Sequence, residues 1–230
     1  MFLDQLSIYS TYLPILIFLW KRPKQRSVWV FLFYIVYTII NDKILSYADS
    51  TGVLTSNPKL EIILLSLFTV VEYSCLAITL NGFIKNRVYK KILKIASIVF
   101  YIVAILNFYI NITSTQEATQ KFDIIPIASS AIISLSFCIL ALFEEMQNPV
   151  IGFIYNTYKF WIILGIMIYF AGTFFFFLYF TTMGRGDKDF FWNINWISII
   201  LKNIFFSIAF LMPNEDPNRE YYQDEYSPEN

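Results

Sequence analysis

Residues 60–83 read LEIILLSLFTVVEYSCLAITLNGF, and residues 191–212 read FWNINWISIILKNIFFSIAFLM. Each stretch is at least as long as the roughly 20 apolar residues with which an α-helix crosses the hydrocarbon core of a bilayer. Each also carries one charge near its middle, Glu72 in the first stretch and Lys202 in the second. A charge at that depth is costly unless it is paired or faces a protein-lined interior. Both residues are therefore candidates for a functional site.

The rest of the chain has the same character as these two stretches. Similar apolar segments lie near residues 3–20, 27–47, 92–111, 123–143 and 158–180. Hydrophobic residues make up 57% of the 230-residue chain and charged residues 15%, against an apolar share of roughly 45–50% in soluble domains. We therefore predict an all-α, polytopic membrane protein in which residues 1–212 form a bundle of seven transmembrane helices.

Lysine and arginine are concentrated in alternate connections between these segments. Residues 21–26 contain four basic residues and residues 85–91 contain four more, whereas the intervening connections carry only Lys59, Lys121, Arg185 and Lys188. Basic connections stay in the cytoplasm. The pattern predicts an N-terminus outside and a C-terminus in the cytoplasm. The richness in Ile, Phe, Asn and Lys favours a bacterial source, and so a multi-pass protein of the inner cell membrane.

The last eighteen residues, 213–230, differ from everything before them. They contain six acidic residues and a single basic one, Arg219. Such a composition cannot form a packed core and is typical of a disordered acidic tail. On the cytoplasmic side this tail is either a solubilising end or a docking peptide for a signalling protein.

Several classes of function are disfavoured by composition. A net charge of zero argues against a nucleic-acid partner. The absence of histidine removes His-ligated metal sites and Ser-His or Cys-His catalysis. Cys75 and Cys138 both lie inside apolar segments, which favours buried thiols over a disulfide or a metal site. No cleavable signal peptide is evident. We expect a protein that is not an enzyme and has no cofactor or metal.

Polar residues accompany the two mid-segment charges at helical spacing. Thr69 shares the face of Glu72, Asn195 and Ser198 share the face of Lys202, and Asn203 lies at its edge. The second segment adds Tyr34, Tyr37 and Asn41, and the sixth adds Tyr169 and Thr173. The candidate site therefore comprises Glu72, Lys202, Asn203, Thr69, Tyr37, Asn41, Tyr169, Ser198 and Asn195.

The depth of the two charges allows them to meet. At 1.5 Å per residue, each lies roughly 16–20 Å from the outer end of its helix. They form either a structural ion pair that fixes helix register or part of a ligand- or ion-binding cavity. A third alternative is a retinal pigment, because microbial rhodopsins also have a lysine on helix seven and a carboxylate on helix three. Ser198, however, stands where those proteins carry an aspartate one turn before the lysine.

Two charged residues near the end of the second segment, and two prolines within segments, are expected to have simpler roles. Asp42 and Lys43 follow Asn41 near the outer end of the second segment, and we expect their side chains to reach water. Pro14 and Pro126 lie within the first and fifth segments, where local kinks are tolerated if neighbouring groups satisfy the freed carbonyls.

A faint internal repeat relates the second and sixth segments. Residues 29–37 read WVFLFYIVY and residues 161–169 read WIILGIMIY, with the tryptophans and tyrosines equally spaced. The same offset overlays the segments around Glu72 and Lys202, give or take one residue. Parallel repeats of this kind predict a 3+1+3 arrangement, with three helices, a linker helix and three more.

Certain aromatic motifs resemble those of a known family. Phe160-Trp161, the run from Tyr169 to Phe174, Glu72-Tyr73 and Lys202-Asn203 resemble a family of uncharacterised seven-helix integral membrane proteins of Bacteroidota. The resemblance runs over most of the chain. It implies a separate receptor subunit, because such proteins often accompany sensor histidine kinases that lack their own sensory domain.

Three functions remain open after these exclusions. The first is a non-enzymatic membrane receptor or sensor that signals to a cytoplasmic partner through the acidic tail. The second is a small transporter or channel with a polar site around Glu72 and Lys202. The third, a lipid-active membrane enzyme of the lysoplasmalogenase type, lacks a convincing pair of aspartates near an interface. The sequence favours the first and leaves the ligand and the oligomeric state open.

Overall fold

The computed structural model describes residues 2–21, 26–113, 124–147, 154–179 and 185–212. In these ranges the regular structure is entirely helical, and seven segments are long and apolar enough to cross a membrane. The predicted all-α architecture is therefore confirmed, with seven helices long and apolar enough to span a membrane, as expected of a multi-pass membrane protein. The predicted acidic tail, residues 213–230, lies outside the described residues.

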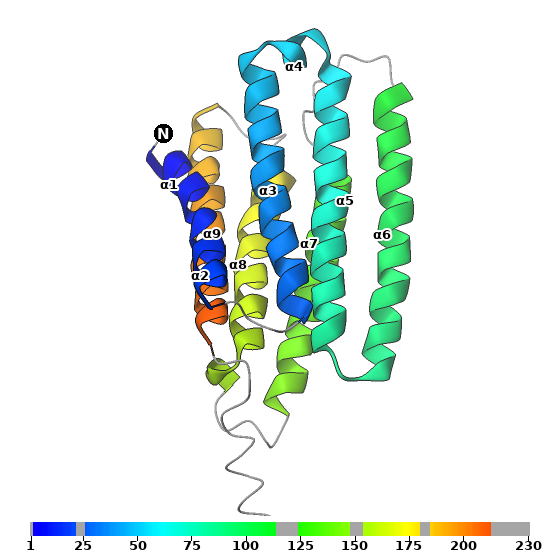
Figure 1. Cartoon of the computed structure of the whole chain (residues 1–230). Coiled ribbons are helices and arrows are strands. Elements are labelled where there is room, and N and C mark those ends of the chain that lie inside the picture. Colours follow the sequence, from blue (N-terminus) through cyan, green and yellow to red (C-terminus); the bar gives the residue numbers. More distant parts are fainter. Residues whose placement is uncertain (1, 22–25, 114–123, 148–153, 180–184, 213–230) are drawn as a thin grey trace, which may run out of the picture.

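The seven spans follow one another as nearly antiparallel helices (Figure 1). The first span consists of α1 (Phe2–Ser10) and α2 (Tyr12–Lys21), and the others are α3 (Arg26–Ser50), α5 (Pro58–Phe83), α6 (Arg87–Thr113), α7 (Ile124–Met146), α8 (Tyr158–Tyr179) and α9 (Arg185–Leu211). A short helix, α4 (Val53–Ser56), joins α3 to α5, and a 3-10 turn, η1 (Ile154–Asn156), precedes α8. Below, the end of the bundle that carries α4 is called the α4 end, and the other the opposite end.

The first span is broken rather than continuous. Proline has no N–H, so Pro14 cannot donate the helical hydrogen bond to the carbonyl of Ser10. Helix α1 ends at Ser10, and the N–H of Thr11 bonds at 3.2 Å to Ile8, only three residues back. The Thr11 hydroxyl donates to the carbonyl of Ser7 at 3.2 Å. The irregularity near Pro14 is thus a full break at Thr11, with hydroxyl groups satisfying the backbone around it.

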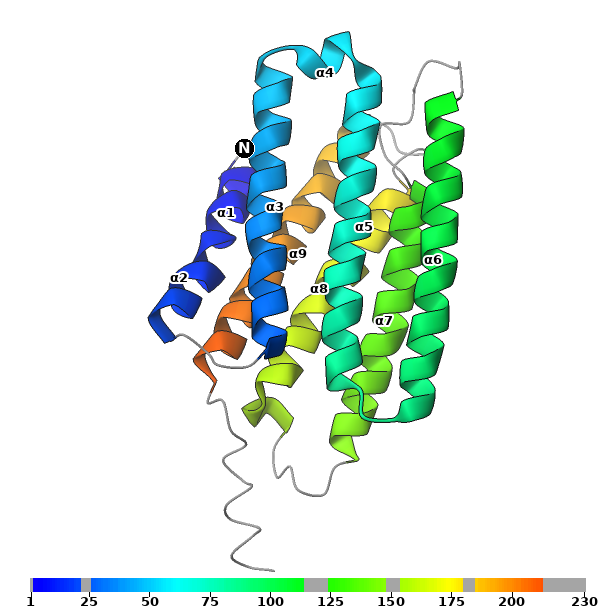
Figure 2. The same ribbon diagram turned by 45° about the vertical axis from the view of Figure 1, so that its right-hand side comes forward.

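The spans form a ring in which sequence neighbours usually pack together (Figures 1 and 2). Helices α1 and α2 lie along α9, α9 along α8, and α8 along α7, while α3 lies along α5 and α5 along α7. Helix α6 packs on α5 and α7 at the outer edge. This arrangement leaves α3, α5, α8 and α9 around a common interior.

Helices α8 and α9 approach each other through two glycines of α8. A Cβ atom built on Gly165 would come within 2.7 Å of the Phe206 ring and 3.3 Å of the carbonyl oxygen of Lys202. A Cβ atom on Gly172 would overlap the side chain of Ser198. Small residues that allow close backbone approach are typical of helix contacts within membranes. The two glycines fix the position of Lys202 relative to α8.

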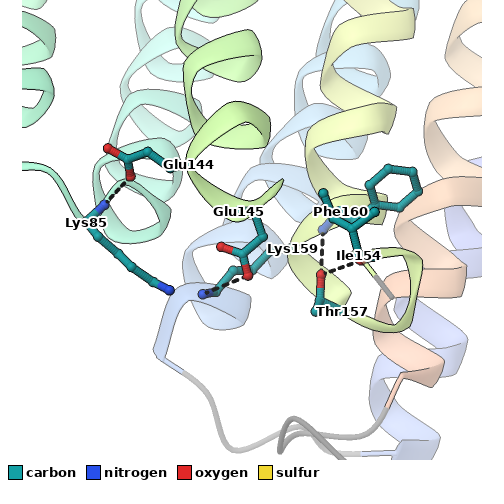
Figure 3. Close-up of polar contacts among 7 residues, drawn as sticks. All are labelled: Lys85, Glu144, Glu145, Ile154, Thr157, Lys159 and Phe160. Carbon is teal, nitrogen blue, oxygen red and sulfur yellow. Dashed lines mark hydrogen bonds and ion pairs between the residues drawn. The ribbon is translucent and has the colours of Figure 1, made fainter. Parts of the chain in front are cut away.

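Two glutamates near the end of α7 fasten the opposite end of the bundle (Figure 3). The Glu144 carboxylate accepts the backbone N–H groups of Lys85 and Asn86 at 2.6 and 3.1 Å, which ties the turn between α5 and α6 to α7. Glu145 lies 3.7 Å from Lys159 at the start of α8. These contacts hold α5, α6, α7 and α8 together at that end.

Candidate functional site

The centre of the interior is a hydrogen-bonded chain of three side chains from three helices. Lys202 of α9 donates from Nζ to the hydroxyl of Tyr34 at 2.9 Å. Tyr34 of α3 donates in turn to Oε1 of Glu72 on α5 at 2.8 Å. All three side chains are buried. These two hydrogen bonds link α3, α5 and α9 at mid-depth. Hydrogen bonds that involve charged groups are stronger than neutral ones.

Tyr169 of α8 completes the cluster from a fourth helix. Its ring centre lies 4.1 Å from Nζ of Lys202, and the ring centre of Tyr34 lies at 5.1 Å. Such contacts of an ammonium group with aromatic rings are attractive. Tyr169 also interacts with the Glu72 carboxylate. The lysine is therefore surrounded by one carboxylate and two tyrosines.

The structure brings Glu72 and Lys202 together without a direct ion pair. Within the described ranges, the ion pair closer than 4.0 Å is the one between Lys159 and Glu145. The two charges are instead linked through the hydroxyl of Tyr34, which accepts a hydrogen bond from Lys202 and donates one to Glu72. The sequence allowed a contact between the charges but could not anticipate the tyrosine between them.

A cavity of about 150 Å³ with a mixed polar and apolar lining lies beside Lys202, and its other residues on α3, α5 and α9 lie on the α4 side of the polar cluster. Its lining is drawn from five spans and consists of Ser7, Ile8, Thr11, Thr38, Asp42, Phe68, Tyr169, Ile199 and Lys202. Lys202 and Tyr169 form the deep end, and Asp42, an exposed residue two turns beyond Tyr34 on α3, lies nearer the α4 end. The cavity can therefore hold a small polar molecule in contact with the buried lysine.

Asp42 is the site residue that sequence reasoning missed. Its side chain is exposed, as expected, but it also lines the same cavity as Lys202. Tyr34, Thr38 and Asp42 recur every four residues, so they share one face of α3. This four-residue spacing could have placed Asp42 in the site, but its position near a helix end favoured a side chain that only reaches water.

Asn203, another predicted residue, lies against the break in the first span and is not part of the cavity lining. Nδ2 of Asn203 donates to the hydroxyls of Ser10 and Thr11 at 2.8 and 3.2 Å. Asn203 is buried and points away from the chain of Lys202, Tyr34 and Glu72. Its role in the structure is to hold α9 against the broken first span.

The remaining predicted residues surround the cluster without lining the cavity. Ser198 and Thr69 are buried, and their hydroxyls donate to backbone carbonyls four residues back, at 2.9 and 3.1 Å. Tyr37 stacks on Phe68, with ring centres 6.0 Å apart. Asn41 is buried on α3. These residues pack around the polar cluster and are not part of the cavity lining.

Asn195 is a special case among them. The residue is buried, and its Oδ1 atom has no hydrogen-bond partner among the described residues. Asn195 lies two turns from Lys202 along α9 towards the α4 end. Nothing in the described structure explains the orphaned oxygen.

An apolar layer closes the interior between the charges and the opposite end. Phe31, Leu76, Ile166 and Phe206 each lie about one turn beyond a member of the polar cluster on the same helix, and each is at most 1% exposed. The rings of Phe31 and Phe206 meet edge to face with centres 4.2 Å apart. The four side chains thus pack between the cavity and the opposite end of the bundle.

The site offers charges and hydroxyls rather than a metal centre. Among the described residues, no three His, Cys, Asp or Glu side chains are grouped closely enough to hold a metal ion. A larger hollow of about 360 Å³ between α5, α6 and α7 has an almost entirely apolar lining. The cavity beside Lys202 is therefore the better candidate for binding a polar ligand. Searches among protein families, curated proteins and solved structures find no match to this chain.

Proposed function

We propose that the chain is a non-enzymatic membrane receptor that binds a small ligand beside Lys202 and signals to a cytoplasmic partner. The observation that carries this proposal is a cavity that reaches a buried charge, with the apolar layer packed beyond it. A pocket bounded by such a layer suits recognition of a ligand better than its passage. Ligand sites between the helices of a bundle are common.

The distribution of basic residues supports an orientation with the α4 end outside the cell. Lys21, Lys85, Arg87 and Lys159 lie at the opposite end, close to the ends of their helices. The α4 end carries Lys43, Lys59, Arg185 and Lys188, whereas the opposite end also has Lys90 and Lys91 near the start of α6. By the positive-inside rule, the cavity would then face the exterior and the predicted tail would extend into the cytoplasm.

A ligand in the cavity would contact four or more spans at once. Thr38, Phe68, Tyr169 and Lys202 come from α3, α5, α8 and α9. Three of these helices, α3, α5 and α9, are also joined by the hydrogen bonds of Tyr34. Ligand binding could therefore change how the helices pack, and such a change would reach the cytoplasmic ends of the bundle.

The experiment that tests the receptor proposal is recovery of the tagged full-length protein from its native membrane in mild detergent. A matched control replaces residues 213–230 with a Gly/Ser linker of equal length. We expect a kinase or another signalling protein to be recovered with the parent and lost with the control. Recovery of no signalling protein with the parent would contradict the proposal.

A small transporter is the second candidate, and the helix arrangement supports it. Helix α3 lies along α5 as α8 lies along α9, and the first span lies along α9 as α7 lies along α5. If α6 is the linker of a 3+1+3 repeat, the first span corresponds to α7, α3 to α8 and α5 to α9, so these contacts match in pairs. Such repeats are found among transporters. Solute flux into vesicles that Glu72→Gln abolishes would establish transport and exclude a purely receptor function.

A further inference from the structure

The cavity contains two opposite charges that do not bond to each other. Lys202 and Asp42 both line it and influence each other electrostatically. No ion pair between them is found among the described residues. Since the two charges line one small cavity without bonding to each other, an occupant of that cavity can contact both.

Both charged groups retain unused hydrogen-bonding capacity. An ammonium group has three donors, and within the described part of the chain Lys202 uses one of them, on the hydroxyl of Tyr34. An ionised carboxylate is an acceptor with two oxygens, and that of Asp42 has no hydrogen-bond or ion-pair partner among the described residues. The cavity therefore presents free donors at its deep end and a free acceptor near its mouth.

The net charge of the interior limits what can bind there. Glu72, Asp42 and Lys202 together carry one excess negative charge when all are ionised. A simple anion placed at Lys202 would also approach Glu72, and a simple cation at Asp42 would also approach Lys202. A ligand that carries both charges places a carboxylate beside Lys202 and an ammonium group beside Asp42 at the same time, and it leaves the net charge unchanged.

We propose that the cavity binds a small zwitterion, with its carboxylate at Lys202 and its ammonium group at Asp42. The proposal names the ligand class of the receptor proposed above and rests on it for its biological meaning. Thr38 and Tyr169 supply hydroxyls along the wall, and Phe68 and Ile199 supply apolar surface. A volume of about 150 Å³ is several times that needed to hold one water molecule. The cavity therefore has room for a small amino acid.

The test uses the purified full-length protein in phosphatidylcholine nanodiscs, without any partner. Glycine, L-alanine, β-alanine and γ-aminobutyrate are titrated by calorimetry, with acetate and methylammonium as probes that each carry a single charge. We expect at least one zwitterion to bind saturably and both single-charge probes to bind at least tenfold more weakly.

Variants of α3 show whether binding takes place in this cavity. Asp42→Asn should weaken the zwitterion about tenfold or more, as expected for one lost charge-assisted contact. Asp49→Asn is the matched control, since Asp49 is exposed on the same helix outside the cavity lining. If Asp42→Asn does not give folded protein, Thr38→Val provides the weakened variant.

Three results would overturn the inference. Acetate binding as tightly as the zwitterions would define a plain anion site at Lys202, and equal binding of methylammonium would define a plain cation site at Asp42. The absence of saturable binding by every zwitterion would exclude the ligand class. Because no partner is present, these results are independent of the recovery experiment. A failure of the zwitterion proposal is therefore distinguishable from a failure of the receptor proposal.

Discussion

Tyr34 is the residue on which the polar cluster depends. Its hydroxyl accepts a hydrogen bond from Lys202 and donates one to Glu72. A hydroxyl can do both at once, so it connects two charges that do not touch. Tyr34 thereby satisfies groups that would otherwise be costly to bury.

Replacement of Tyr34 by phenylalanine should therefore destabilise the protein by about 2 kcal/mol, the typical cost of leaving buried charged groups without a hydrogen-bond partner. Tyr37→Phe is the matched control on the same helix. Tyr37 is half-buried and stacks on Phe68, and its substitution should cost less than about 0.5 kcal/mol. Thermal unfolding in detergent measures both variants, and equal effects of the two would refute a bridging role for Tyr34.

A double-mutant comparison tests the coupling of the charges themselves. Lys202→Met leaves Glu72 without its cation and should cost about 3–5 kcal/mol, as does removal of one partner from a buried pair. The double variant Glu72→Leu with Lys202→Met removes both charges and should be more stable than either single variant. If the single variants unfold at the parent temperature, the charges contribute nothing to stability.

The residues of the site differ in how far the sequence could predict them. Glu72 and Lys202 stood out because charges at bilayer depth are rare. Tyr34 could not be chosen over Tyr37, since both lie on the second span and the chain contains 16 tyrosines. Asn203 was grouped with Lys202 because the two are adjacent, yet successive helical residues point about 100° apart. Its partners, Ser10 and Thr11, depend on which helices meet.

At the scale of the elements, the contact of α8 with α9 controls the position of the lysine. Gly172 leaves room for Ser198, and Gly165 leaves room for Phe206 and the backbone of Lys202. The two glycines are seven residues apart, so they lie on nearly the same face of α8. A side chain at either position would push α9, and Lys202 with it, away from Tyr169.

Gly172→Ala should therefore destabilise the protein by about 1–3 kcal/mol, as overpacking of a filled interior does. Gly82→Ala on α5 is the control, because a Cβ atom there has no neighbour within 4 Å. It should leave the stability unchanged or raise it by up to about 1 kcal/mol. Thermal unfolding of both variants gives the comparison. A Gly172→Ala protein as stable as Gly82→Ala would mean that α8 and α9 do not pack this closely.

The spans themselves were predictable, and their interruptions were not. Long apolar runs determine where helices cross, so seven spans followed from the sequence. Pro14 indicated where the first span could be irregular. The position of the break at Thr11 depends on hydrogen bonds made by Ser7, Ser10 and Asn203 around it. Such contacts involve a helix almost 200 positions away, which periodicity cannot identify.

At the scale of the whole molecule, the two ends of the bundle differ in their chemistry. The α4 end carries the connection through Gly52 and Ser56, and the opposite end carries the carboxylate contacts of Glu144 and Glu145. Basic residues such as Arg87 lie at the opposite end. We infer from this difference that the α4 end faces the exterior.

Cysteine labelling in intact cells checks this orientation. Ser56→Cys at the α4 end should react with a membrane-impermeant maleimide in intact cells. Arg87→Cys, at the opposite end, should react only after permeabilisation. Both positions are exposed, and the native Cys75 and Cys138 are buried, so the background should be low. The reverse labelling pattern would invert the proposed topology.

The break at Thr11 has a mechanical consequence. Helix α1 contributes Ser7 and Ile8 to the cavity wall, whereas in α2 the Phe18 ring packs on Phe210 and Trp29. Since the backbone hydrogen bonds are interrupted between them, we expect α1 to tilt more easily than a segment of a continuous helix, within the limits that Asn203 sets at Ser10 and Thr11. The wall of the cavity formed by α1 is then expected to be more compliant than the others. Bending at Thr11 would then accommodate an occupant of slightly different length, with little change in the packing near the opposite end of the bundle.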